Sequence, residues 1–271
     1  MWKQVSKMTT HQTVKTSYIS YGDAQIAYRR FGAVSGTPLL FLIHFRGTMD
    51  KWDPLLINSI ASSRPVILVD YVGVGQSTGT VATSFRQSAN NIIEFLSLIG
   101  VEEVDILGFS IGGFVAELVT LNANPTKLKV RKLILSGTGA SVGPGIEVSG
   151  NSYMPAATAG RIDLENFKEL FFAHNSVGNR AAEQWWSRIA ERNEATSGEV
   201  PSQWLSYDLN DGGFGMKNQG SSLELWFKRE TSQGLEGSYD RLNQIKIPVL
   251  IANGSVRYYL LGVVPDTSFV L

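Results

Sequence analysis

The stretch VDILGFSIGG at residues 104–113 decides the fold of this 271-residue chain. An apolar run leads into Gly108, Ser110 and Gly112, which have the spacing G-x-S-x-G, and a helix-like segment follows. This context predicts a nucleophile elbow, a sharp strand-to-helix turn that presents a serine hydroxyl. Glycine is needed on both sides of the serine, because a Cβ there would collide with neighbouring backbone. Ser110 is therefore the candidate nucleophile, and an incidental serine in an ordinary turn is the alternative.

Apolar runs bounded by turn residues alternate with helix-like stretches on both sides of this elbow. That alternation predicts an α/β fold with a mostly parallel sheet and helices on both faces. The predicted strands are Leu39–His44, Pro65–Asp70, Val104–Phe109, Lys132–Ser136 and Pro248–Ala252, preceded by a hairpin that joins Ser17–Ser20 to Ala24–Arg30. The predicted helices lie within Lys51–Ser62, Ser84–Gly100 and Gly112–Ala123.

A second motif stands at the end of the first predicted parallel strand, where residues 43–47 read IHFRG. A backbone N–H of Phe45 or Arg46, together with that of Ile111, is expected to bind the oxyanion of a tetrahedral intermediate. His44 has two interpretations. It could be a catalytic residue, but it precedes the nucleophile in the chain, and we favour a role in orienting the loop through its ring nitrogens.

Three stretches now carry a resemblance: HFRGTMDKWDP at 44–54, DYVGVGQS at 70–77, and the elbow Gly108–Gly113. They resemble the α/β-hydrolase superfamily, and more narrowly its branch with an H-F-x-G-x-x-D-x-W-D-P loop. The resemblance runs from about Tyr18 to Gly254. It implies an eight-stranded sheet, a helical cap, and a Ser–acid–His triad that acts on esters, lactones or related carbonyl compounds without a cofactor.

The predicted domain organisation is a core interrupted by one insertion. Residues 1–16 are expected to form a disordered leader, residues 17–139 and 244–271 the α/β-hydrolase core, and residues 140–243 a helical lid. A lid at this point would cover the carboxyl ends of the strands, where open α/β sheets bind ligands. Its aromatic residues either line an apolar pocket or form the core of the lid itself; they are Phe171, Phe172, Trp185, Trp186, Trp204 and Trp226.

The sequence departs from the family pattern near its C-terminus. Asn253-Gly254-Ser255 lacks the acid expected after the last ordinary strand, and the only histidines, His11, His44 and His174, precede this point. The segment 137–140 holds no carboxylate, while Glu147 and Asp266 have no motif support. The C-terminal helix, the last strand and the catalytic histidine are therefore expected to be missing. In a serine protease, loss of the histidine alone costs about 10⁶ in turnover, so weak or absent hydrolysis is predicted.

The tail admits several interpretations. Residues 249–252, Asn253-Gly254 and residues 255–261 have the pattern strand, type I′ turn, strand, which predicts an antiparallel edge strand. A frayed or helical tail and an altered gene end are the alternatives.

Composition narrows the functional classes. The chain has no cysteine, which excludes disulfides and thiol catalysis, and its 24 basic and 24 acidic residues give no reason to expect nucleic acid as a partner. No stretch reaches the roughly 20 apolar residues that span a bilayer, and the cytoplasm is the expected location. A dinucleotide site is excluded because Gly73-Val74-Gly75 lacks the third glycine. Three functional hypotheses stay open: a serine hydrolase with a small-molecule substrate, a ligand-binding pseudoenzyme, and the product of a damaged gene. The oligomeric state is also open.

Overall fold

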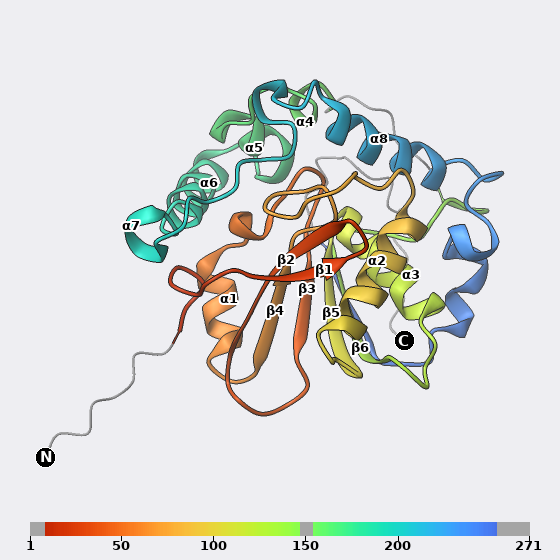
Figure 1. Cartoon of the computed structure of the whole chain (residues 1–271). Helices are drawn as coiled ribbons and strands as arrows, with labels where there is room; N and C mark the ends of the chain where they lie inside the picture. Colours follow the sequence, from red (N-terminus) through yellow and green to blue (C-terminus); the bar gives the residue numbers. More distant parts are fainter. Residues whose placement is uncertain (1–8, 147–153, 254–271) are drawn as a thin grey trace, which may run out of the picture.

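A computed structural model describes residues 9–146 and 154–253 of the chain (Figure 1). The strands of these residues form one sheet in the order β1-β2-β4-β3-β5-β6-β7. β1 pairs with β2 and β2 with β4 in antiparallel fashion, and all other neighbours are parallel, so the predicted mostly parallel sheet is confirmed. The strands are β1 (Ser17–Tyr21), β2 (Ala24–Gly32), β3 (Leu39–Leu42), β4 (Pro65–Val69), β5 (Glu103–Phe109), β6 (Lys129–Ser136) and β7 (Val249–Ala252).

Burial of the central strands shows that both faces of the sheet are covered. Every residue of β3 and β4 is buried, although successive side chains of a strand point to opposite faces. The helices α1 (Pro54–Ala61), α2 (Phe85–Leu98) and α3 (Ile111–Asn122) belong to this core. α1 begins at Pro54 after Asp53, whose carboxylate accepts from the N–H of Leu55, and Ser84 caps α2 in the same way. The predicted core strands and helices are thus present, with their ends shifted by a few residues.

A helical insertion, called the lid below, lies between β6 and β7 and covers one end of the sheet (Figure 1). Its aromatic residues divide between two cores. Trp185, Trp186 and Trp204 pack around Phe167 inside the lid. Trp226 instead stacks on Phe114 of α3, with 4.8 Å between the ring centroids. The α-helices are α4 (Met154–Ala157), α5 (Leu164–Phe171), α6 (Ser176–Ile189), α7 (Glu194–Ser197) and α8 (Phe214–Trp226). The 3₁₀ helices are η1 (Met49–Lys51), which precedes α1, and η2 (Tyr207–Leu209), η3 (Gly234–Glu236) and η4 (Tyr239–Gln244).

Residues 9–16, which the sequence assigns to a disordered leader, pack against the core and the lid. Val14 and His11 are buried, and Nη1 of Arg192 in the lid donates to their carbonyl oxygens at 2.8 and 3.0 Å. The prediction is therefore wrong for this part of the leader. A buried cation that satisfies backbone carbonyls orders the segment, and a local sequence pattern does not reveal a partner so distant in the chain.

Several predictions fall on residues outside the described ranges. These are the rest of the leader at residues 1–8, Glu147, and the tail from residue 254, which includes the edge strand expected at 255–261, the missing C-terminal helix and last strand, and Asp266. Within residues 9–146 and 154–253, no helix is long and apolar enough to cross a membrane.

The topology of the sheet has a switch point at the carboxyl ends of β3 and β5. β3 lies between β4 and β5, so the chain leaves β3 toward one side of the sheet and leaves β5 toward the other. Ligands of open α/β sheets bind at such a switch point. The loop after β3 contains Phe45 and Arg46, and β5 runs into Ser110.

Candidate active site

Ser110 is the single residue between a strand and a helix. β5 ends at Phe109 and α3 begins at Ile111, and Ser110 has φ 57° and ψ −124°. A serine with positive φ is strained, and the surrounding hydrogen bonds hold it there. Its N–H donates to the carbonyl of Ser136 at 3.0 Å, and Thr138 Oγ1 donates to its carbonyl at 2.7 Å. The side chain is nearly buried, with 6% exposure.

The glycines of the elbow allow α3 to approach the sheet closely. A Cβ at Gly112 would overlap the carbonyl of Leu42 at the end of β3, and a Cβ at Gly108 would overlap the carbonyl of Gly112. The first turn of α3 therefore rests directly on the backbone of β3. This contact brings the N–H of Ile111 toward the loop that follows β3.

Two backbone amides have the properties of oxyanion donors. Among the described residues, neither Phe45 N nor Ile111 N donates to any acceptor. The first N–H groups of a helix have no partner inside the helix, which explains the free amide of Ile111. The amide of Arg46 is different, because it donates to Oε1 of Gln219 on α8 at 2.8 Å. Of the two predicted alternatives in this loop, the structure therefore leaves Phe45 as the candidate.

The backbone amide and the side chain of Arg46 connect this loop to the lid. The residue has φ 62°, and its guanidinium is buried and donates only to backbone carbonyls. Burial lowers its pKa to about 10, so the group stays charged at neutral pH. Its carbonyl also accepts from the N–H of Leu205 at 2.9 Å. The acceptors are the carbonyls of Leu205 (2.8 Å from Nε), Ala159 (2.6 Å from Nη1), Ala157 (3.2 Å from Nη1), Gly160 (3.3 Å from Nη2) and Ser206 (3.3 Å from Nη2).

Asp50 anchors the other end of the same loop. Its carboxylate accepts from Arg29 Nη1 at 2.6 Å and from Ser202 N in the lid at 2.8 Å, and Arg192 Nε lies 3.0 Å away. Burial alone would raise the pKa of Asp50, but the charge and hydrogen bond of Arg29 hold it below its ordinary value. The loop is thus fixed by an ionised, buried carboxylate as well as by Arg46.

His44 lies in an aromatic cluster formed by the core and the lid. Its ring centroid is 5.5 Å from that of Phe109, 5.8 Å from Phe171 and 5.6 Å from Trp204. Nδ1 is 2.9 Å from the carbonyl oxygen of Phe45, and because that oxygen only accepts, Nδ1 carries the proton. Burial lowers the pKa of His44 to about 4, which makes it a poor base at neutral pH. These features favour the orienting role over the catalytic one.

Among the described residues, no histidine is hydrogen-bonded to Ser110. Ser110 Oγ makes no hydrogen bond to residues 9–146 or 154–253. His11 is buried, and desolvation followed by the charge of Arg29 lowers its pKa to about 3. His174 lies on the exposed surface of the lid, with Nε2 at 3.2 Å from the carbonyl of Glu169. The same ranges contain no cluster of acidic and histidine side chains that could hold a metal ion.

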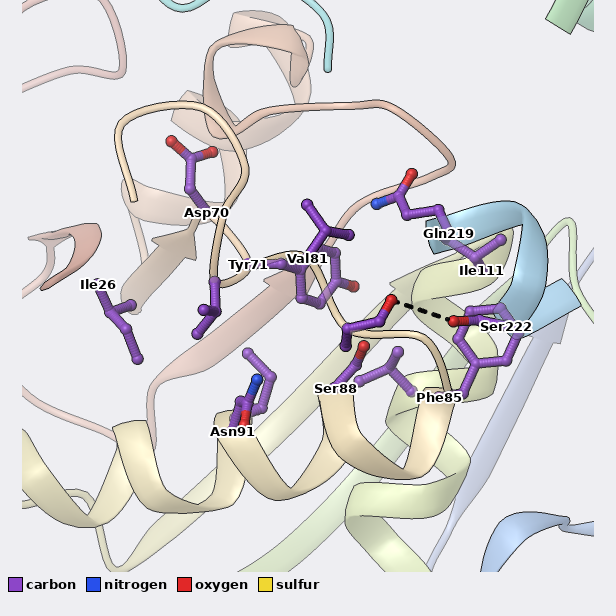
Figure 2. Close-up of a pocket in the computed structure, with 14 residues that line it drawn as sticks. Ile26, Asp70, Tyr71, Val81, Phe85, Ser88, Asn91, Ile111, Gln219 and Ser222 are labelled. Atoms are coloured by element: carbon purple, nitrogen blue, oxygen red, sulfur yellow. Dashed lines mark hydrogen bonds between the residues drawn. The ribbon is translucent and has the colours of Figure 1, made fainter. Parts of the chain in front are cut away.

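A cavity adjoins the elbow on the side of α2 and α8 (Figure 2). Ile111 lines it, but Ser110 does not, so the cavity is a chamber next to the nucleophile. Asp70 and Gln219 also line it. Burial, and secondarily the charge of Asp50, raises the pKa of Asp70 to about 7. Both carboxylate oxygens of Asp70 already accept backbone hydrogen bonds, from Met49 at 2.7 Å and from Gln76 at 2.9 Å.

Sequence reasoning did not identify Gln219 or the structural role of Arg46. A single glutamine in a polar helix carries no signal, and Arg46 was singled out only for its amide. Asp50 had a signal, because it is the aspartate of the H-F-x-G-x-x-D motif.

Known proteins resemble this chain at several levels. A family model described as "alpha/beta hydrolase fold" matches residues 37–255. The chain is 30% identical over 161 residues to the dihydrolipoyllysine-residue acetyltransferase component of the acetoin cleaving system of Cupriavidus necator; the match covers 58% of this chain and 40% of that protein. The chain therefore spans less than half of that relative.

Solved structures agree on the fold. An α/β hydrolase fold protein from Chitinophaga pinensis superposes with a TM-score of 0.69 at 24% identity, over 90% of this chain and 91% of that one. A structure of the N-acyl homoserine lactonase AidH, complexed with N-butanoyl homoserine, gives a TM-score of 0.58 at 17% identity, over 90% and 80%. At these identities the likeness shows the fold alone.

Proposed function

Since the chain belongs to the α/β hydrolase fold family, we propose that it is a serine hydrolase for small, apolar esters, lactones or related carbonyl compounds. The observation that carries this proposal is the arrangement around Ser110. The serine sits at a strained strand-to-helix turn, and two backbone amides nearby have no acceptor among the described residues: Phe45 N in the loop after β3 and Ile111 N at the start of α3. The chemistry needs no cofactor.

In the proposed reaction, Ser110 Oγ attacks the carbonyl carbon of the substrate. The carbonyl oxygen becomes negative and accepts hydrogen bonds from Phe45 N and Ile111 N, each worth on the order of 3 kcal/mol in such sites. The amino terminus of α3 also favours negative charge at this point. The intermediate then expels the alcohol, which carries away the proton that the Ser110 hydroxyl gave up. Water next attacks the acyl-enzyme, releases the acid and returns a proton to the serine oxygen.

The aromatic cluster beside the elbow supports an apolar substrate. Phe109 precedes the nucleophile, and Phe171 and Trp204 come from the lid. Lactones are included in the class because they present the same carbonyl chemistry, and the fold of a known lactonase is compatible with it. The cytoplasmic location expected from the sequence stays a prediction.

A ligand-binding protein without efficient turnover is the second candidate. The observation that favours it is the absence of any hydrogen bond from Ser110 Oγ to the described residues. A serine without a base retains only the contribution of the oxyanion donors and of binding, roughly 10³–10⁴ over water. The two candidates differ in the reactivity of one hydroxyl.

Labelling with a fluorophosphonate probe decides between them. We expect the purified chain to be labelled at Ser110, slowly because no base among the described residues is bound to its hydroxyl, and the Ser110→Ala variant to be unlabelled. Butyrate esters should slow the labelling further by competition. Ser97→Ala is a matched control, because it removes an exposed serine hydroxyl from α2 and leaves the proposed nucleophile and its hydrogen bonds in place. Labelling of the parent no faster than of Ser110→Ala would contradict the hydrolase and support the ligand-binding protein.

A further inference from the structure

The loop after β3 begins with a tight turn at residues 44–47. The N–H of Gly47 donates to the carbonyl of His44 at 3.0 Å and closes a four-residue β-turn. Arg46, the third residue of the turn, has φ 62°, whereas φ of Phe45, the second residue, is not positive. A positive φ at the third residue alone is the pattern of a type II turn.

Arginine is a strained residue at the third position of a type II turn. That position favours glycine or asparagine, because a Cβ crowds the backbone when φ is positive. Rotation of the peptide between Phe45 and Arg46 by about half a turn would relieve the strain. It converts a type II turn into a type I turn, in which φ of the third residue is negative and most residues are accepted. Contacts from outside the turn must therefore hold the type II form.

Two side chains hold this peptide, one at each end. Its carbonyl oxygen, that of Phe45, accepts from Nδ1 of His44 at 2.9 Å. Its N–H, that of Arg46, donates to Oε1 of Gln219 at 2.8 Å. Rotation of the peptide exchanges the directions of the oxygen and the N–H, so it would break both hydrogen bonds. The peptide can change its orientation only if both contacts are lost together.

The magnitudes show that both contacts are needed. A positive φ at arginine disfavours the type II form by about tenfold, and each hydrogen bond favours it by about tenfold. Two bonds together outweigh the strain, whereas one bond only balances it. Arg46 is fully buried, and a buried N–H without an acceptor costs more than the net contribution of its bond. Loss of the acceptor at Gln219 should therefore leave the type I form in the majority.

Gln219 is the distant member of the pair. It projects from α8 of the lid (Figure 2) and is 5% exposed, and among the described residues Arg46 N has no other acceptor. His44 adjoins Phe45 in the chain and stays beside it wherever the lid lies. Gln219 reaches the turn only while α8 packs on the core. The type II form is thus tied to the docking of one lid helix.

We propose that Gln219 is a positioning residue for the oxyanion loop: its acceptor oxygen keeps the turn at residues 44–47 in the type II form and thereby keeps Phe45 N in place. Phe45 N–H belongs to the adjoining peptide of the same turn, so its direction depends on the form of the turn. The inference rests on the proposed function, in which Phe45 N binds the oxyanion. It goes further by making a docked α8 a condition for a complete oxyanion site. Gln219 acts through the backbone of Arg46 and need not touch the substrate.

Carbon chemical shifts of Arg46 test the form of the turn without any substrate. In full-length protein labelled with ¹³C and ¹⁵N, the Cα and Cβ shifts of a residue distinguish positive from negative φ. The parent should show the values of positive φ. Gln219→Met should move the shifts most of the way to the values of negative φ, as a ratio of about ten to one for the type I form requires. Gln219→Glu should keep the parent values, because a carboxyl group offers an acceptor oxygen in either protonation state.

Asn218→Leu is the matched control on the same helix. It removes another hydrogen bond between α8 and the core, from Nδ2 of Asn218 to the carbonyl of Val81 at 3.1 Å, and leaves Gln219 in place. The Arg46 shifts should stay at their parent values in this variant. A residue that merely docks α8 would give the same result as Asn218 and would not be replaced by glutamate without loss.

The rate of fluorophosphonate labelling tests the consequence for the site, because the phosphonyl oxygen occupies the proposed oxyanion site. Only the type II fraction is competent, so Gln219→Met should be labelled about tenfold more slowly than the parent. Gln219→Glu and Asn218→Leu should be labelled at the parent rate. Labelling of Gln219→Met at the parent rate would overturn the positioning role.

The chemical shifts also separate this inference from the proposed function. Arg46 shifts of negative φ in the parent, parent values in Gln219→Met, or equal displacement in Asn218→Leu would overturn the inference whether or not Ser110 is labelled. A parent that is not labelled would contradict the hydrolase, and the shifts alone would then decide whether Gln219 holds the turn.

Discussion

The elbow at residues 108–113 and the loop at residues 44–50 each place one candidate oxyanion donor, yet different parts of the chain hold them. Contacts of the elbow come from the sheet: Ser110 N donates to Ser136, and Gly112 abuts Leu42. Contacts of the loop come largely from the lid, through the buried guanidinium of Arg46 and through Asp50, which accepts from Ser202 N.

The elbow is held by local contacts, whereas the loop is held by contacts between residues that lie far apart in the chain. The elbow needs only neighbouring strands and two glycines to reach its shape. The loop instead depends on partners far along the chain, and the acceptor of the Arg46 amide lies 173 positions later. The position of the Phe45 amide is therefore coupled to the lid, whereas that of the Ile111 amide is set by the sheet.

A substitution in the elbow is expected to have the largest effect on stability and on labelling. Gly112→Ala places a Cβ against the carbonyl of Leu42, which is backbone and cannot swing away. We expect a loss of about 3 kcal/mol in the free energy of unfolding, at the upper end of overpacking costs. We also expect fluorophosphonate labelling to slow about a hundredfold, because the amide of Ile111 moves. Urea denaturation and labelling rates measure the two effects.

Gly220→Ala on α8 is the matched control. A Cβ there meets nothing within 4 Å, so the change should stabilise the helix by about 0.5–1 kcal/mol. If Gly112→Ala proved no more destabilising than Gly220→Ala, the close contact between α3 and β3 would be contradicted.

The pH dependence of stability sharpens the comparison, because the loop contains one buried carboxyl and the helix that follows the elbow contains another, and their pKa values shift in opposite directions. Asp50 in the loop is paired and its pKa lies below the ordinary value, so its stabilisation is lost as the pH falls. Glu117 on α3 has an unpartnered Oε2, and burial raises its pKa to about 8. The folded state thus binds this proton more tightly than the unfolded state, and stability falls as the pH rises from about 4.5 toward 8.

Glu117→Gln should remove that decline. The variant and the parent are expected to be about equally stable near pH 5, and the variant more stable by about 3 kcal/mol at pH 8. Part of the gain is offset because the amide of glutamine brings a donor that also needs a partner. Thermal unfolding across this pH range measures the difference, and parallel curves for the two proteins would refute the buried, protonated carboxyl.

The sequence predicted the elbow half well for a physical reason. The strand 104–109, the glycines and the helix after Ser110 are encoded by adjacent residues, and hydrophobic periodicity reveals them. The hairpin, the parallel strands and the core helices were predictable for the same reason. The order of the strands, with its switch point between β3 and β5, comes from the structure.

The contacts of the loop at residues 44–50 were only partly predictable from the sequence. The motif at residues 43–47 indicated an oxyanion loop, but nothing local shows that Arg46 binds carbonyls of residues 157–206 or that its amide goes to Gln219. The packing of residues 9–16 was mispredicted for the same reason, since its partner Arg192 is about as distant. Interactions between segments far apart in the chain leave no periodic pattern in either segment.

Hydrogen exchange of an Arg46→Met variant tests most directly whether the lid holds the loop and the sheet holds the elbow. Mass spectrometry follows peptides that cover residues 43–50 and 104–115, with Arg161→Met as control, since Arg161 is an exposed lid arginine paired with Asp208 at 2.7 Å. The account predicts exchange at least about tenfold faster in residues 43–50 of Arg46→Met, with residues 104–115 unchanged, and no change in Arg161→Met. Equal loss of protection in both peptides, or none in either, would contradict it.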